Sequence, residues 1–146
     1  MACVVLPIKE VTALNPRSST LKRLIDENVN LNYESKKGTV QPWVQLELSS
    51  KSVVNVVEII NRPSYDWNRL SEVEVRVGNE EVTQKNTQGL STNKLCGKYK
   101  GPGKRGQVVR IQCDEAITGK YVTIQIKDKL VKVMSIAEVA VIGRHL

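Results

Sequence analysis

The sequence contains one histidine, three cysteines and no phenylalanine. The single histidine, His145, lies beside the C-terminus, where chains commonly fray, so an enzyme with a nucleophile–histidine pair would have to take its base from a chain end. A histidine-rich metal centre is excluded for the same reason, and the cysteines lack C-x-x-C spacing. We therefore expect neither a hydrolase nor a zinc enzyme.

The chain also lacks a long apolar run. Its longest apolar stretches, such as residues 53–60 (VVNVVEII), are far shorter than the roughly 20 residues that a membrane span needs. Residues 1–9 have no positively charged start and no sustained apolar core, so they are not a secretory signal as they stand. Two locations stay open: the cytoplasm, or the extracellular space if a signal peptide has been removed.

Length and composition predict a single globular domain over residues 1–146. Domains run roughly 100–200 residues, and 40% hydrophobic with 25% charged residues is ordinary for a folded chain. Lysine and arginine outnumber the acids by 22 to 15, which gives a net charge of +7. This surplus favours association with acidic surfaces or polymers, but it carries no information about the fold.

The apolar residues follow the pattern of β-strands. Valine is abundant, and β-branched residues pack well on a pleated surface. Six segments either alternate with a period of two or form a short apolar run between turn residues: 43–48, 53–60, 73–77, 108–113, 121–126 and 137–142. Helical spacing is brief, and residues 21–26 suffice for a turn or two. The pattern predicts an all-β domain, an antiparallel sandwich or small barrel.

Three polar segments between these strands are predicted to be loops: 27–41, 79–94 and 96–106. The last one (CGKYKGPGKRG) combines four glycines, one proline and four basic residues, so we expect an exposed, bent loop. Its basic residues are a candidate contact for a polyanion: Lys98, Lys100, Lys104 and Arg105. The alternative is an ordinary solvated surface loop.

Residues 41–78 contain the most informative order of motifs. Pro42-Trp43 opens a strand, a second apolar strand ends in Asn61-Arg62, and a short loop leads to Arg69-Leu70 before an alternating strand that ends in Val77-Gly78. This region resembles the F-type lectins (fucolectins), whose equivalent reads roughly PWW-x-V-D-L, then N-R-x-D-C-C-x-x-R-L, then a strand ending in V/I-G. Matches to the family's I-D-G-N, G-R-Y-V and C-E-V motifs extend the resemblance to most of the chain: Ile25 to Asn28, Gly119 to Val122, and Glu138-Val139.

The resemblance implies a jelly-roll β-sandwich of the galactose-binding-like type, with a pocket for terminal fucose at its end loops. In that family a histidine and two arginines hydrogen-bond the sugar, and a disulfide between adjacent cysteines packs against the ring. Arg62 and Arg69 fall on the two arginine positions. Ser35 stands at the histidine position, and Ser64 replaces the acid that steadies the arginines.

Further departures alter the wall of the implied pocket. Tyr65 and Asp66 replace the adjacent cysteines. Tyr65 or Trp67 would offer a flat apolar face to a sugar, and Asp66 would pair with an arginine. Two alternatives stay open: the arginines tie their loop to its neighbours, or the pocket holds another ligand or none. We interpret Trp43 as a core residue, since large aromatic side chains dominate packing.

The resemblance also implies a structural calcium ion and a disulfide. It places Asp26, Asn28 and Glu138 among the calcium ligands, and Ca²⁺ takes six to eight oxygens, which the run DENVNLN is suited to supply. The alternative is a turn capped by its own side chains. Cys96 and Cys113 occupy paired family positions, which implies a disulfide and an oxidising compartment, with Cys3 left over.

These observations predict a non-enzymatic carbohydrate-binding lectin for fucose or a related saccharide. Its partners would be glycans or glycoproteins, in host defence or cell recognition as in relatives. A homo-oligomer would strengthen binding by presenting several weak sites together. The alternative is a module that retains the sandwich but binds protein or a polyanion through the basic loop.

Overall fold

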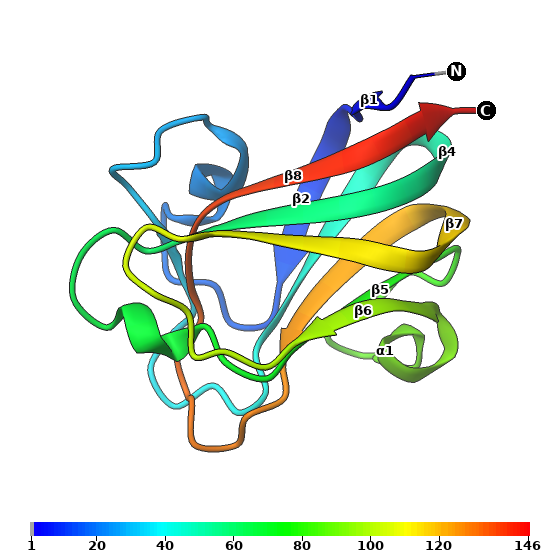
Figure 1. Ribbon diagram of the computed structural model, residues 1–146. Coiled ribbons are helices and arrows are strands. Elements are labelled where there is room, and N and C mark those ends of the chain that lie inside the picture. Colours follow the sequence, from blue (N-terminus) through cyan, green and yellow to red (C-terminus); the bar gives the residue numbers. More distant parts are fainter. Residues whose placement is uncertain (1) are drawn as a thin grey trace.

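The computed structural model describes residues 2–146 and is built almost wholly from antiparallel strands (Figure 1). The strands are β1 (Val4–Val5), β2 (Ile8–Ala13), β3 (Tyr33–Glu34), β4 (Trp43–Asn61), β5 (Val73–Gly78), β6 (Lys94–Tyr99), β7 (Val108–Ile126) and β8 (Ser135–His145). The helices are short: 3₁₀ helices η1 (Leu21–Ile25) and η2 (Trp67–Arg69), and α1 (Gly89–Thr92). The all-β prediction is confirmed.

Strands β4 and β7 are each 19 residues long and pair along most of their length. Residues 43–47 pair with 121–125, the register then shifts, and residues 52–60 pair with 108–119. The sequence pattern predicted two strands in each segment, separated by polar residues. That division is wrong, because pairing resumes on both sides of the polar run 49–52, so the run bends β4 without ending it.

The bends fold one continuous sheet into two facing layers, which is the predicted β-sandwich. The strand order is β1-β8-β4-β7-β5-β6, with β2 added on β4 and β3 on β8. One layer contains β2, the first part of β4, the last part of β7, β5 and β6, and the other contains the remaining halves with β8, β1 and β3. The apolar core between the layers includes Leu46, Val57, Ile59, Ile124 and Ile136, all fully buried. Burying such side chains stabilises the fold by roughly 1.5–3 kcal/mol each.

The predicted loops contain more regular structure than their polarity suggests. Segment 27–41 includes β3, whose Tyr33 is fully buried, and segment 79–94 includes α1. The first residues of the basic segment 96–106 belong to β6, which pairs with β5. The strands β3 and β6 are paired through backbone hydrogen bonds, which need no apolar side chains, so a search for apolar patterns does not find them.

The loops gather at the end of the sandwich opposite to the two termini (Figure 1). The blue-to-cyan segment around η1, the green segment with η2 and the yellow segment before β7 lie there, whereas the N and C labels mark the other end. Leu24 in η1 and Leu70 after η2 are fully buried and fix these two segments to the core, and Met134 does the same for the connection before β8. One end of the sandwich is therefore formed by loops that are held on the packed core.

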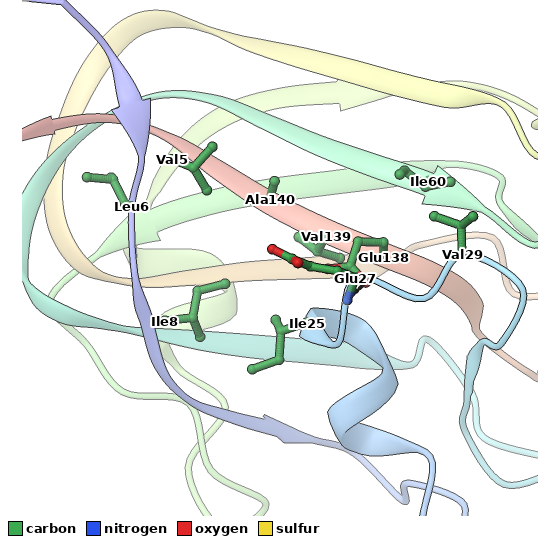
Figure 2. A pocket seen from close by; sticks show the side chains of 10 residues that line it. All are labelled: Val5, Leu6, Ile8, Ile25, Glu27, Val29, Ile60, Glu138, Val139 and Ala140. Atoms are coloured by element: carbon green, nitrogen blue, oxygen red, sulfur yellow. Dashed lines mark hydrogen bonds between the residues drawn. The ribbon is translucent and has the colours of Figure 1, made fainter.

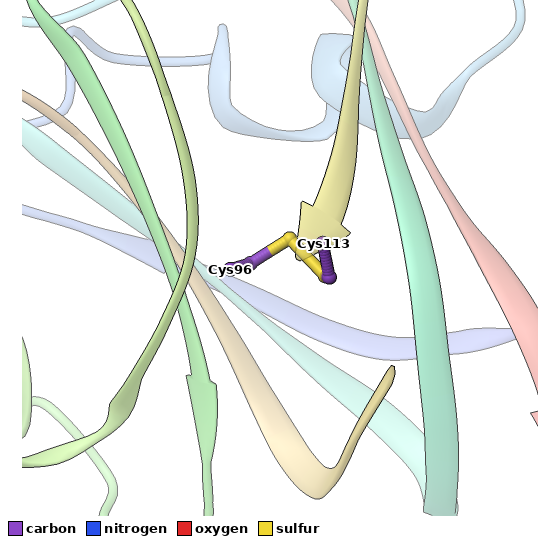
Figure 3. The surroundings of a disulfide bond; sticks show 2 residues. All are labelled: Cys96 and Cys113. Atoms are coloured by element: carbon purple, nitrogen blue, oxygen red, sulfur yellow. A yellow bond between two sulfur atoms is a disulfide. The ribbon is translucent and has the colours of Figure 1, made fainter. Parts of the chain in front are cut away.

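A disulfide between Cys96 and Cys113 links β6 with β7, as the family resemblance implied (Figure 3). Both residues are buried, while Cys3 is a free, exposed cysteine. Trp43 is buried in the core as expected. Within residues 2–146, no helix has the length and apolar character to cross a membrane.

Candidate functional site

One short loop at this end carries both predicted sugar-binding arginines. Strand β4 ends at Asn61, Arg62 follows it, and Arg69 ends η2. Asp66 turns the chain into η2 with a φ of 60°, a left-handed conformation that aspartate tolerates better than most residues. Its carbonyl accepts a hydrogen bond from Arg69 N (3.2 Å). The turn brings the two arginine side chains to the same pocket.

The buried side chain of Asn61 fastens this loop to the basic loop before β7. Its Nδ2 donates to the carbonyls of Trp67 and Lys104 (both 2.8 Å), and its Oδ1 accepts from Arg62 N (2.9 Å). Gly106 N adds a bond to Arg62 O (3.0 Å). The two loops therefore form one hydrogen-bonded unit.

A pocket of about 530 Å³ opens between this unit and residues 34–37. Nine residues line it: Arg17, Glu34, Ser35, Lys36, Lys37, Arg62, Tyr65, Asp66 and Arg69. Five of the seven predicted ligand-binding residues are therefore brought together. The other two, Ser64 and Trp67, lie outside this lining; Ser64 Oγ accepts a hydrogen bond from Arg62 Nε (3.0 Å).

The carboxylate of Glu34 lies at the centre of the charges in the pocket. Its Oε1 is 2.8 Å from Arg17 Nη1, and its Oε2 is 3.3 Å from Arg69 Nη1 and 3.6 Å from Arg62 Nη1. The side chain is only 17% exposed. The carboxylate of Glu34 thus lies within 4.0 Å of three guanidinium groups.

The two predicted arginines differ in how fully their neighbours satisfy them. Arg69 donates to Ser135 Oγ (2.9 Å) and pairs with Asp66 Oδ2 (3.0 Å) in addition to Glu34, so the predicted pairing of Asp66 is observed. The Arg62 side chain is 7% exposed, and its Nη1 has no hydrogen-bond acceptor within residues 2–146. A buried donor without an acceptor costs about 1–3 kcal/mol, and the charge of Arg62 is offset only by the carboxylate that Glu34 shares with two other arginines.

An exposed aromatic ring stands beside these charges. The Cζ atom of Arg62 lies 4.4 Å from the centroid of the Tyr65 ring, a cation–π contact. Tyr65 is nevertheless 69% exposed. The ring is thereby positioned by Arg62 and still offers apolar surface to a ligand.

Ser35 anchors the opposite wall. Its Oγ accepts from Met134 N (2.8 Å), and its own N donates to Met134 O (3.0 Å). Its hydroxyl hydrogen remains a donor. The predicted position of Ser35 opposite the arginine loop is what the structure has, but its neighbours Glu34, Lys36 and Lys37 were missed. The only sequence signal for them was their adjacency to the histidine position of the family.

The predicted calcium ligands lie in the turn after η1 and on β8. Asp26 Oδ1 accepts from Asn28 N (2.9 Å), Asn28 Oδ1 accepts from Asn30 N (3.1 Å), and Glu138 Oε1 accepts from Glu27 N (3.0 Å). Figure 2 shows Glu27 beside Glu138 in a largely apolar pocket of about 480 Å³. Asp26 and Asn28 thus cap the backbone of their own turn, and Glu138 joins the turn to β8.

The surroundings of Glu138 change how readily it loses its proton. Burial raises the pKa of Glu138 to about 7, and the charges of Asp26 and Glu27 act in the same direction, against the Glu27 N–H hydrogen bond, which lowers it. No three Asp, Glu, His or Cys side chains within residues 2–146 are grouped to hold a metal. An ion here would therefore take amide and backbone carbonyl oxygens as well, and calcium accepts such mixed oxygen ligands.

The residues of the predicted polyanion contact are exposed but are divided between two places. Lys98 and Lys100 border a groove that also contains Lys127, Glu72 and Glu74, and Glu74 pairs with Arg76 (2.8 Å). Lys104 and Arg105 lie in the following turn, outside that groove.

Comparison with known proteins identifies the family of the fold. A family model described as NedA-like, galactose-binding domain matches residues 23–124. A pentraxin fusion protein of Xenopus laevis is 30% identical over 130 residues, which cover 86% of this chain and 29% of that protein, so the chain spans less than a third of this curated relative.

Two solved structures share the fold over nearly the whole chain. An F-lectin (fucolectin) from the serum of striped bass, Morone saxatilis, has a TM-score of 0.76 and 26% identity, covering 94% of this chain and 46% of that one. The family 32 carbohydrate-binding module of C. perfringens NanJ, in complex with galactose, has a TM-score of 0.78 at 17% identity, covering 97% and 99%. The galactose-binding-like sandwich is therefore established for this chain.

Proposed function

The chain belongs to the family of NedA-like, galactose-binding domains, and from that premise we propose that it is a non-enzymatic lectin module that binds a terminal sugar. The observation that carries the proposal is the pocket in which Arg62 and Arg69 flank one carboxylate beside the exposed ring of Tyr65. A guanidinium offers five N–H donors in a fixed fork and can bracket neighbouring hydroxyl groups. The aromatic ring complements them by covering an apolar face of the sugar.

We take fucose or a closely related saccharide as the sugar, borne by a glycan or glycoprotein. The arginine positions and the relation to a fucolectin support this choice. The fucose pocket is diverged, with Ser35 in place of the family histidine and Tyr65 and Asp66 in place of the adjacent cysteines. Extracellular recognition of cell-surface glycans is part of the proposal, supported by a disulfide that needs an oxidising compartment.

A glycan array followed by calorimetric titration tests the proposal. We expect binding to fucose- or galactose-terminated glycans, and a loss of at least tenfold in affinity in Arg69→Ala, since a hydrogen bond from a charged donor contributes about 1.5–3 kcal/mol. Arg144→Ala is the control, because Arg144 lies beside the C-terminus at the opposite end of the sandwich (Figure 1). An array without any bound glycan, or an equal loss in both variants, would contradict the proposal.

We also propose that Asp26, Asn28 and Glu138 hold a structural calcium ion near the pocket loops. Calcium at about 100 times its dissociation constant should stabilise the fold by about 2.7 kcal/mol, seen as a rise in melting temperature that a chelator reverses. Glu138→Gln should remove this response, and Glu115→Gln, a change at an exposed acid on β7, should retain it. A melting temperature indifferent to millimolar calcium would exclude the ion.

Polyanion binding through the basic loop stays a prediction and is not adopted as a second function. Lys98 and Lys100 border one groove and Lys104 and Arg105 lie outside it, so the four basic residues do not line one continuous site. Homo-oligomerisation likewise stays a prediction, to be measured by the molar mass in solution. Weak single sites would then gain strength from being presented together.

A further inference from the structure

The charges that surround the sugar pocket are strongly unbalanced. Five of the nine lining residues are basic and two are acidic. Both acids are already engaged, Glu34 with three arginines and Asp66 with Arg69. Building on the proposed function, we propose that the pocket prefers a saccharide that carries an anionic group, a carboxylate or a sulfate ester, over the neutral sugar of the same ring.

Arg62 supplies the first independent observation. Its side chain is nine-tenths buried and lines the pocket, and its Nη1 lies 3.6 Å from Glu34 Oε2, which is too long for a hydrogen bond. The same Glu34 carboxylate also serves Arg17 and Arg69, so one negative charge is shared among three cations. An anionic ligand group would supply the negative charge that this shared carboxylate only partly provides, and a neutral hydroxyl group would not.

Lys36 and Lys37 add positive charge to the pocket that no acid among residues 2–146 offsets. Both are exposed at the pocket, and neither lies within 4.0 Å of a carboxylate in the described part of the chain. The backbone that carries them is fixed, because Lys36 N donates to Asn15 O (2.8 Å) and Lys36 O accepts from Thr39 Oγ1 (2.6 Å). Their ammonium groups therefore have no ion pair to break when an anion binds.

The geometry suits an anionic substituent on the sugar in particular. In the proposed mode the two arginines bracket the ring hydroxyls and Tyr65 covers an apolar face of the ring, which leaves the charged substituent for Lys36 and Lys37. Arginine binds carboxylate and sulfate oxygens through paired N–H donors, while lysine acts on either as a point charge. Carboxylated and sulfated sugars share the feature that the pocket would recognise: a cluster of anionic oxygens beside a ring rich in hydroxyl groups.

Calorimetric titration with four sugars tests this inference apart from the proposed function. Methyl galactoside, methyl galacturonoside and methyl galactoside 6-sulfate differ only at C6, and methyl fucoside serves as a second neutral sugar. We expect at least one acidic sugar to bind about tenfold more tightly than methyl galactoside. Raising the salt from about 0.05 to about 0.5 M should reduce that ratio, since salt screens exposed charges. The carboxylate and sulfate arms distinguish the two kinds of anion.

The double variant Lys36→Ala/Lys37→Ala should lower the acidic-to-neutral ratio to below about threefold. Lys51→Ala/Lys85→Ala removes two exposed lysines outside the pocket and should keep the ratio. Equal binding of neutral and acidic sugars would overturn the inference and leave the proposed function standing. If both double variants kept the preference for acidic sugars, or lost it equally, the preference would not come from Lys36 and Lys37. This result would also overturn the inference. Binding of none of the four sugars would overturn both.

Discussion

Replacing Glu34 by alanine is expected to lower the free energy of unfolding by roughly 2–4 kcal/mol and to weaken binding of methyl fucoside at least tenfold. The carboxylate lies within 4.0 Å of three guanidinium groups, and two of these, on Arg62 and Arg69, are largely buried. Without it, like charges face one another with little solvent to screen them. The arginines would then separate, and the spacing of their donors would be lost.

Chemical denaturation and calorimetry on one set of variants separate the two effects. Glu58→Ala is the matched control, because Glu58 pairs with a single arginine, Arg110, at 2.8 Å outside the pocket. It should cost less than about 1 kcal/mol, as surface pairs do, and leave the affinity unchanged. If Glu34→Ala behaved like Glu58→Ala in both measurements, other contacts would position the arginines.

Most of the fold could be predicted from the alternation of apolar residues, because the sandwich buries every second residue of its strands. In β5 the side chains of Val73, Val75 and Val77 are buried and those between them are not, as the alternation predicts. Gln45 illustrates what alternation cannot predict. The pattern places it on the solvent face of β4, yet it is buried, and its amide exchanges two hydrogen bonds with the backbone of Val82. The segment around Val82, distant in sequence, covers that face, and the alternation within β4 does not predict this contact.

The site likewise contains residues that the sequence predicted and others, such as Glu34, that it did not. Arg62 and Arg69 were found because they belong to one motif in one short segment. Glu34 comes from a two-residue strand whose place depends on tertiary contacts, with Glu34 N donating to Thr20 Oγ1 (3.3 Å) and Ser35 N donating to Met134 O (3.0 Å). Its charge was visible in the sequence, but its three partners become neighbours only when the sandwich closes.

Asn61 carries the second large expected effect, because its side chain joins the two loops on which the pocket depends. Asn61→Ala would leave the carbonyls of Trp67 and Lys104 and the amide of Arg62 without these partners. We expect a loss of roughly 2–4 kcal/mol in unfolding free energy, since unpaired buried polar groups cost about 1–3 kcal/mol each and water reaches some of these. Sugar affinity should fall several-fold as the loop of Arg62 and Arg69 loosens.

A second buried asparagine separates loop positioning from general stability. Asn93 makes a similar bridge, with Nδ2 donating to Glu80 O (2.8 Å) and Oδ1 accepting from Glu80 N (3.1 Å), but it lies beside α1, away from the pocket loops (Figure 1). Asn93→Ala should therefore destabilise the fold and leave sugar affinity intact. Asn61→Asp, although isosteric, should be at least as damaging as Asn61→Ala, because it directs a carboxylate at two carbonyl oxygens. Were Asn61→Asp to retain both stability and affinity, the amide could not be the bond that holds the two loops together.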